Sequence, residues 1–186
     1  MDTIIDLIGA AIVAGIVMVG IANINIYSTQ VRFKSNSDLQ LQQNAKTIAD
    51  ILDNDMRKIG YGYSGTSIIT ADSQDIKFYA DIDSDNVADQ VEYVLSDTNS
   101  VSYTENPEDR ILYRIVNGDT SKGPSLGITK LRFTYKNLLG NVTTALDSIK
   151  YIKAEIWVQS PNKVYENGEE KYLFTYWELT INPRNI

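Results

Sequence analysis

The chain has 186 residues and a net charge of −7, with 43% hydrophobic and 22% charged residues, which is the composition of a protein that folds. Cysteine and histidine are both absent, so disulfides, the commonest zinc ligands and the commonest catalytic base near neutral pH are excluded. Lysine and arginine form no cluster, so nucleic acid is not expected as a partner. An enzyme is therefore the least expected class, and we predict that the chain is not one.

The first element in chain order is an apolar segment. Residues 7–22 (LIGAAIVAGIVMVGIA) contain no polar side chain, and with their flanks they reach the length of about 20 residues that crosses a bilayer. Ala10 with Ala14, and Ala11 with Gly15, place small residues four apart, which lets helices approach closely in lipid. Hydropathy by itself predicts a membrane anchor.

Asp6 lies one turn into this segment. An acid in a membrane helix costs about 2.5–3.5 kcal/mol at the centre and less near an end. One interpretation is a helix-terminal acid near the headgroups, where the helix dipole favours negative charge. The other starts from the neighbouring residues. Residues 3–7 (TIIDL) resemble the start of mature type IV pilins and type II secretion pseudopilins, in which Thr-Leu-Ile-Glu-Leu opens an apolar helix.

This resemblance implies how the chain assembles. In that family the acid pairs with the N-terminal ammonium of a neighbouring subunit, so that two charges enter the filament core together. Asp6 is the matching position, with Ala10, Ala11, Ala14 and Gly15 at the helix contacts. The partners would be copies of this chain or other pilin-like subunits. The cytoplasmic membrane would anchor the subunit before assembly, and the filament would lie at the cell surface or across the periplasm.

The sequence also departs from the family pattern. Asp replaces Glu, the helix lacks a central proline, and no basic leader ending in Gly precedes the motif. Two origins remain open, a sequence in mature form and an atypical leaderless subunit, and with them whether Asp6 is the fifth or the sixth residue. Orientation is open as well. Arg32 and Lys34 beyond the span predict a cytoplasmic domain, whereas a removed basic leader would reverse that prediction.

The next segment is amphipathic. Its apolar residues recur at spacings of three and four, which places them on one helix face: Leu41, Ala45, Ile48, Leu52 and Met56. Ser37-Asp38 offers a local helix restart, and Gly60 a stop. A continuous helix over residues 3–59 would be about 85 Å long at 1.5 Å per residue. Residues 57–61 (RKIGY) resemble the end of this helix in larger minor pilins.

The remainder predicts β-strands. Most candidate segments alternate with period two and are rich in β-branched or aromatic residues: 75–80, 90–95, 100–103, 111–116, 131–136, 149–158 and 172–181. Turn signals separate them at Asn117-Gly118, Gly123-Pro124, Gly140-Asn141 and Ser160-Pro161, and residues 162–171 predict an exposed hairpin loop. Short connections favour an antiparallel meander. We predict an α+β fold with three parts: an apolar helix over 1–30, its amphipathic continuation over 31–60, and a β-rich domain over 61–186.

The segment between two of these strands is acidic. Asp81, Asp83 and Asp85 alternate and are followed by Asp89, as in the first half of an EF-hand loop that binds Ca²⁺ with oxygen ligands. Asn86 replaces the glycine of that loop, although Asn tolerates the left-handed conformation. Two interpretations therefore stand, a calcium site and an ordinary turn built from Asp and Asn.

Three functional classes follow from these features. The first is a filament or pseudopilus subunit, either a major subunit that coats a fibre or a minor one that initiates it or acts in secretion, DNA uptake or adhesion. The second is a membrane-anchored extracytoplasmic binding module that does not polymerise, with tyrosines such as Tyr61 and Tyr63 as contacts. The third is an enzyme using paired carboxylates such as Asp53 and Asp55, which on a helix point in different directions.

Overall fold

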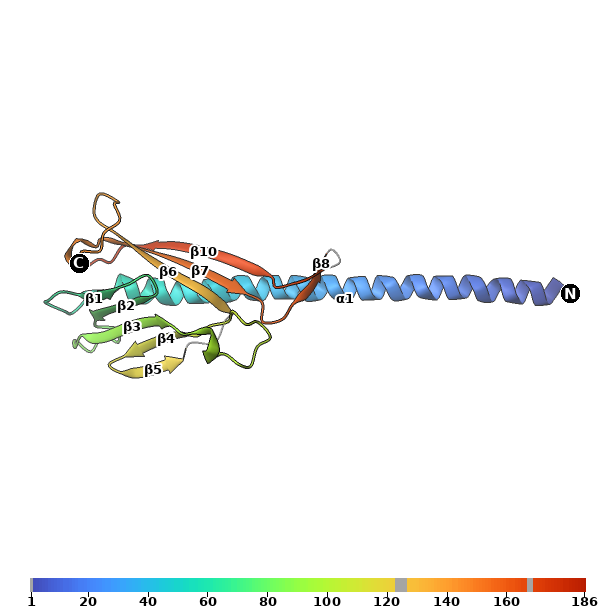
Figure 1. Ribbon diagram of the computed structural model, residues 1–186, viewed down its shortest axis with the longest axis horizontal. Coiled ribbons are helices and arrows are strands. Elements are labelled where there is room, and N and C mark those ends of the chain that lie inside the picture. The colour runs from blue at the N-terminus through green and yellow to red at the C-terminus, as the bar shows by residue number, and fades with distance from the viewer. Residues whose placement is uncertain (1, 123–126, 167–168) are drawn as a thin grey trace.

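The computed structural model describes residues 2–122, 127–166 and 169–186, so Met1 and the predicted turn at Gly123-Pro124 lie outside the described residues. Within these ranges the chain forms one long helix, α1 (Asp2–Arg57), followed by short antiparallel strands, β1 to β10. Figure 1 shows the helix running the whole length of the molecule, with every strand gathered around the half that ends near the C-terminus of the chain. The fold is α+β.

Helix α1 is continuous over 56 residues, which is about 84 Å at 1.5 Å per residue. The predicted single helix is confirmed, and Ser37-Asp38 lies within it rather than at a restart. The helix ends where expected. Gly60 has a φ of 81°, and a Cβ atom there would lie 2.3 Å from the carbonyl oxygen of Asn185, so only glycine fits this position.

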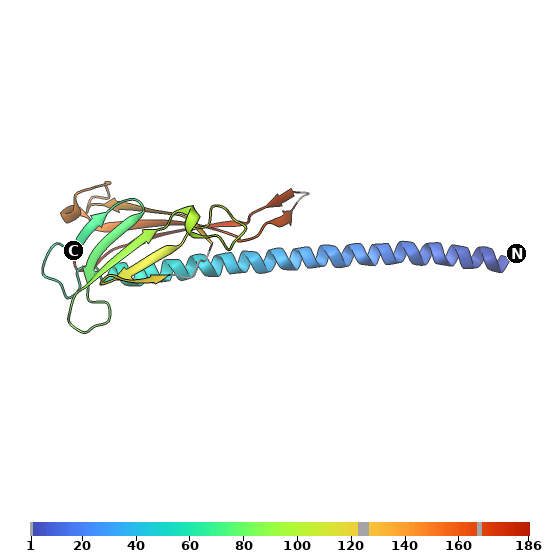
Figure 2. The same ribbon diagram turned by 60° about the horizontal axis from the view of Figure 1, so that its bottom comes forward.

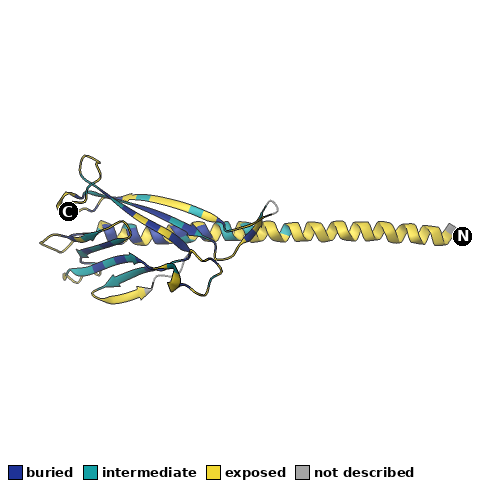
Figure 3. Cartoon of the chain, in the orientation of Figure 1, coloured by how far each residue is buried: buried dark blue, intermediate teal, exposed yellow. Residues whose placement is uncertain are grey.

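The two halves of α1 differ in burial (Figure 3). Residues 3–27 are exposed on all sides, because no other element reaches them. From Leu41 onward one face is buried, and its members are those predicted from the spacing: Leu41, Ala45, Ile48, Leu52 and Met56, each at most 4% exposed. The amphipathic half of the helix therefore packs on the domain, and the apolar half projects from it.

Five strands form the first sheet, in the order β1-β2-β3-β4-β5 with every pair antiparallel. Their bounds are Ile68–Ala71, Asp75–Ala80, Asp89–Leu95, Leu112–Val116 and Asp119–Lys122. The predicted turn at Asn117-Gly118 joins β4 to β5, and both residues have positive φ (53° and 90°), as in a two-residue type I′ hairpin. Alternate residues such as Ile76, Phe78 and Val91 face the core.

The second sheet has the order β10-β7-β6, again antiparallel. Its strands are β6 (Ile128–Lys136), β7 (Tyr151–Gln159) and β10 (Phe174–Ile181). A small hairpin of β8 (Val164–Glu166) and β9 (Glu169–Lys171) is inserted between β7 and β10. Figure 2 shows this hairpin reaching beyond the domain toward the projecting half of α1. Lys34 of α1 forms an ion pair with Glu166 of the hairpin, which also pairs with Lys171.

A single core lies between the helix and the two sheets. Apolar residues of α1, β2, β3, β6 and β7 meet there, and the largest fully buried side chains include Leu52, Met56, Phe78, Leu131 and Ile156. The sheets are also joined directly, because the Phe133 amide donates to the Ser73 carbonyl (2.8 Å) and the Tyr135 hydroxyl donates to the Asp72 carbonyl (2.8 Å). The predicted antiparallel meander is therefore divided into two sheets that enclose one helix face.

Some strand predictions need correction. Residues 100–103 do not form a strand: a 3₁₀ turn, Thr98–Ser100, ends there and β3 pairs with β4 instead. The segment contains only two apolar residues, and Tyr103 is 69% exposed. Strands β1 and β5 were not predicted. Residues 162–171 were predicted as a loop but contain β8 and β9, with 167–168 outside the described residues.

Candidate assembly surface and acidic loop

The projecting half of α1 is a continuous apolar surface. Its large side chains are at least 47% exposed from Ile4 to Val31, including Leu7, Ile16 and Met18. One window of this helix has a mean hydropathy of 2.6 and none of it is buried, so by length and composition the helix is able to cross a membrane. Apolar surface of this extent is unfavourable in water, so lipid or other apolar helices must cover it.

Small residues interrupt this surface, and no neighbouring atom of the described chain requires them to be small. A Cβ atom added at Gly9, Gly15 or Gly20 would meet no atom within 4 Å. Glycine within a helix costs about 1 kcal/mol relative to alanine, and no contact within the described chain requires glycine at these positions. Ala10, Ala11 and Ala14 are exposed beside them. These positions are suited to the close approach of a second helix.

Asp6 stands in the same exposed segment. The steps from Asp6 to Ala10 and from Ala10 to Ala14 are each four residues, so the three lie along one side of the helix. No hydrogen bond or ion pair from the described residues reaches the Asp6 carboxylate. A charge in apolar surroundings is far less costly when it is paired, so a cation beside this carboxylate would lower the cost of placing it there.

The acidic loop connects β2 to β3, as predicted. One carboxylate oxygen from each of Asp81, Asp83 and Asp89 lies within 4.8 Å of the others, whereas Asp85 is not part of this group. Asn86 has a φ of 69°, which is the left-handed conformation expected where an EF-hand loop has glycine. Glu92, at the twelfth loop position, lies in β3 and pairs with Lys77 (2.7 Å).

Backbone amides already occupy much of this carboxylate group. Asp81 is 2% exposed, and its two oxygens accept hydrogen bonds from the amides of Ser84 (2.7 Å) and Asn86 (3.0 Å). Asp89 accepts from the Ile82 amide (3.2 Å) and from Asn117 (2.6 Å). Such bonds are typical of turns built by Asp and Asn. Calcium binding at this loop stays a prediction.

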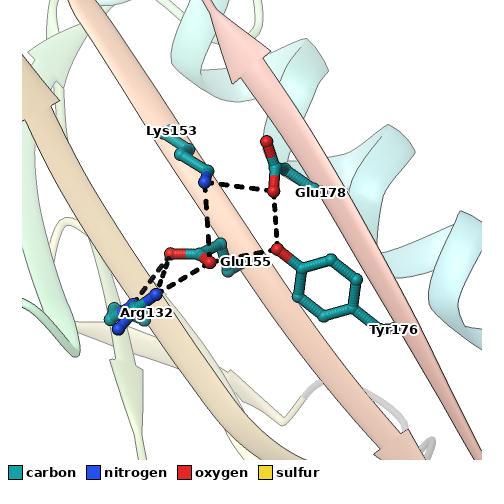
Figure 4. A network of polar contacts seen from close by, with 5 residues as sticks. All are labelled: Arg132, Lys153, Glu155, Tyr176 and Glu178. Atoms are coloured by element: carbon teal, nitrogen blue, oxygen red, sulfur yellow. Dashed lines mark hydrogen bonds and ion pairs between the residues drawn. The ribbon is translucent and has the colours of Figure 1, made fainter.

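A polar network covers the outer face of the second sheet (Figure 4). Glu155 of β7 is 5% exposed and accepts two hydrogen bonds from the Arg132 guanidinium, both 2.8 Å long. Lys153 lies 3.0 Å from Glu178 and 3.6 Å from Glu155. The Tyr176 hydroxyl lies 2.6 Å from Glu178 and 3.0 Å from Glu155. Two carboxylates thus face two cations across three strands.

The network keeps both carboxylates charged. Burial acts to raise the pKa of Glu155, but hydrogen bonds from Arg132 and Tyr176 outweigh it and the pKa is lowered. Hydrogen bonds from Tyr176 and Lys153 likewise lower the pKa of Glu178. At neutral pH both groups are ionised acceptors, so neither holds a proton to donate.

Aromatic side chains border this network. The Trp157 ring centroid lies 5.1 Å from that of Tyr176 and 4.7 Å from the Lys130 amine. Phe174 is 69% exposed. Trp157, Phe174 and Gln159 help to line an open hollow of about 670 Å³ at one end of the sheet. The outer face therefore combines exposed rings with hydrogen-bonding groups, as binding surfaces often do.

One buried polar cluster was not predicted from the sequence. Asp55 of α1 is 4% exposed and accepts hydrogen bonds from the Tyr93 hydroxyl (2.5 Å) and the Arg114 guanidinium (2.6 Å). Asp53 instead pairs with Arg57 on the helix surface (2.7 Å). The two acids point apart, as expected from helix geometry, and Asp55 ties the end of α1 to the first sheet.

The whole chain was compared with protein-family models, with curated proteins and with solved structures, and none matches. An assignment of function therefore depends on the geometry of the chain itself.

Proposed function

We propose that this chain is a structural subunit of a type IV pilus-like or pseudopilus filament, which assembles by packing of its N-terminal helices. The observation that carries the proposal is the projecting half of α1. It is apolar and exposed on every side over residues 3–27, and it contains one acid, Asp6. A simple anchor needs the apolar surface alone. A bundle of such helices also gives a role to the acid and to the small residues.

Features of the helix surface support this assembly. Ala10, Ala14 and Asp6 share one side of the helix, so a neighbouring helix that packs on the alanines also approaches the carboxylate. Gly9, Gly15 and Gly20 leave space that the chain itself does not fill. The partner charge for Asp6 is then the N-terminal ammonium of a neighbouring copy or of another pilin-like subunit, as in the family that residues 3–7 resemble.

The location of the protein follows from the same proposal. Before assembly the apolar half of α1 is held in the cytoplasmic membrane, and afterwards it forms the core of a filament at the cell surface or across the periplasm. The β-rich domain, with the network of Figure 4, then coats the filament exterior.

The outer sheet face favours a second candidate, a membrane-anchored extracytoplasmic binding module that does not polymerise. Trp157, Tyr176 and Phe174 present rings beside hydrogen-bonding groups there, and a hollow of about 670 Å³ adjoins them. In this case α1 serves only to hold the domain at the membrane.

Substitution of Asp6 separates the two candidates. The protein and its Asp6→Ala variant are expressed in membranes and examined by electron microscopy for fibres and by cross-linking for oligomers. We expect fibres or ordered oligomers from the parent chain and a strong loss from Asp6→Ala. Asp50→Ala is the matched control, because Asp50 is an exposed acid on the domain-bound half of the same helix. Monomers from the parent chain and both variants would favour the binding module.

A further inference from the structure

A pocket lies where α1 leaves the β-rich domain. Phe33, Gln40 and Leu41 contribute to its helix wall, and Asp109 and Pro161 to the wall formed by domain loops. Its volume is about 380 Å³, which lies within the range of pockets that bind small organic groups. It is separate from the acidic loop and from the outer face of the second sheet. We call it the Asp109 pocket.

The pocket contains a carboxylate that is buried without a partner. Asp109 is 1% exposed, and neither of its oxygens has a hydrogen-bond partner among the described residues. Burial raises the pKa of Asp109 and nearby Thr104 acts to lower it, but the Thr104 hydroxyl is directed at the Asn106 carbonyl oxygen, 3.5 Å away. Buried polar groups in folded proteins almost always have partners. A group that enters the pocket from outside would therefore satisfy Asp109.

The other walls define the chemistry of that partner. Phe33, Leu41 and Pro161 offer apolar surface, while Ser37 and Asn162 offer hydroxyl and amide groups. Arginine and lysine combine an apolar stem with a cationic head, and a cation is also stabilised by an aromatic ring. A guanidinium or ammonium side chain matches this lining, with its head at Asp109 and its stem along the apolar wall.

One cation on α1 is placed to reach such a pocket in another copy. Arg32 is exposed, and no charged group of the described chain pairs with it. It precedes core-facing Leu41 by nine residues, which at 3.6 residues per turn is two and a half turns. The Arg32 side chain therefore points away from its own β-rich domain. It also lies directly before the helix residues that line the pocket, so a small axial offset between parallel helices brings the two together.

We propose that the Asp109 pocket receives the Arg32 guanidinium of a second copy of this chain. The ion pair joins adjacent subunits at the base of their domains, beyond the apolar helix contacts. It neutralises a buried carboxylate whose two oxygens both lack a hydrogen-bond partner among the described residues, so the pair forms only on assembly. This inference rests on the proposed filament function, because it requires copies with parallel α1 helices.

Cysteine cross-linking tests the contact directly, because the chain contains no cysteine of its own. Arg32→Cys and Asn162→Cys are made in separate full-length chains with tags of different size and co-expressed in membranes. Asn162 is exposed at the pocket rim. We expect a disulfide-linked dimer that contains one copy of each. Lys46→Cys replaces Arg32→Cys in the control, because Lys46 is also exposed on α1 but lies further along the domain-bound half, and it should give no such dimer.

A double-mutant cycle tests whether the ion pair between Asp109 and Arg32 contributes to assembly. Asp109→Asn and Arg32→Gln should each weaken self-association about tenfold or more, Arg32→Lys should weaken it less, and the double variant should be no worse than either single one. Lys46→Gln should have no effect.

The outcomes separate this inference from the proposed function. Fibres of normal yield from both Asp109→Asn and Arg32→Gln, with no Arg32–Asn162 disulfide, would overturn the ion pair and leave the filament intact. Absence of self-association in the parent chain would overturn the filament and, with it, the pairing between copies.

Discussion

Individual polar residues attach α1 to the β-rich domain through hydrogen bonds and ion pairs. Asp55 accepts bonds from Tyr93 and Arg114, residues 38 and 59 positions away, and all three lie at the junction of helix and first sheet. Asp53, two residues earlier, makes only an exposed pair with Arg57. Asp53 and Asp55, two acids of the same helix turn, therefore contribute differently to the free energy of unfolding. A charge removed from water is stabilised only through its partners, whereas an exposed pair contributes little.

We expect Asp55→Ala to lower the free energy of unfolding by about 3 kcal/mol, because it leaves the Tyr93 hydroxyl and the Arg114 guanidinium without their buried acceptor. Asp53→Ala is the matched control and should cost about 0.5 kcal/mol or less. Urea denaturation of both variants measures the difference. Equal losses from the two variants would contradict the role given to Asp55.

Asp109 has the opposite effect on stability. Burial raises its pKa in the folded protein, so the ionised form, present above that pKa, opposes folding. As the pH falls through the folded pKa, the native state takes up the proton first and the penalty disappears. The monomer therefore buries a carboxylate whose ionised form is disfavoured by its own fold.

We expect Asp109→Asn to raise the free energy of unfolding by about 1 kcal/mol near neutral pH, since a neutral amide of the same size replaces the unpaired charge. The difference from the parent chain should be largest at about pH 8 and vanish at about pH 3, below the unfolded pKa. Thermal unfolding at the two pH values tests this. An unchanged or lower midpoint at about pH 8 would show that Asp109 is satisfied in the monomer.

At the scale of single elements, the conformation of the β2–β3 loop depends on one side chain. The β2–β3 loop is closed by Asp81, whose carboxylate accepts bonds from the amides of Ser84 and Asn86. The same carboxylate lies within 4.8 Å of Asp83 and Asp89. The loop is therefore already folded by hydrogen bonds, and a cation would have to compete with backbone amides for the Asp81 oxygens.

Calcium binding by the β2–β3 loop can be tested directly. If the loop binds Ca²⁺, calorimetric titration at millimolar concentration should show heat, and added Ca²⁺ should raise the thermal midpoint of the protein. Asp83→Asn should abolish both effects, whereas Asp147→Asn, on an acid outside the loop, should not. No heat at this concentration would identify the loop as an ordinary turn, which its amide bonds already explain.

At the scale of the whole molecule, one part of α1 packs on the β-rich domain and a separate part forms the proposed assembly surface. Within the part of the chain that the structure describes, the buried hydrophobic residues lie at Leu41 or beyond, while the exposed apolar surface of α1 lies mainly before it. The Lys34–Glu166 ion pair marks the boundary between the two parts. The residues that stabilise the domain are therefore different from those of the proposed assembly surface, apart from the Asp109 pocket.

Removal of residues 1–28 should consequently give a monomeric domain that stays in solution without detergent. We expect its free energy of unfolding to equal that of the full chain in detergent within about 0.5 kcal/mol, because no buried contact is lost. Ultracentrifugation and chemical denaturation test the two parts of this prediction. A truncated domain that aggregates or unfolds would show that the projecting half contributes to the fold.

Local pattern was enough for much of this architecture. The spacing of Leu41, Ala45 and Ile48 defined the buried helix face, and period-two segments such as 75–80 and 131–136 became β2 and β6. The Asn117-Gly118 turn followed from its residue types. The apolar segment and Asp6 were likewise visible in the sequence. These features were predictable because helices, strands and tight turns depend on residues only a few positions apart.

Only the tertiary structure decided the rest. It divided the strands between two sheets, showed that residues 100–103 are no strand, paired Asp55 with Arg114, and buried Asp109 without a partner. It also gathered Glu155, Arg132 and Glu178 into one network from three strands. Each of these depends on residues far apart in the chain, whose approach is determined by packing of the whole core and not by any local pattern.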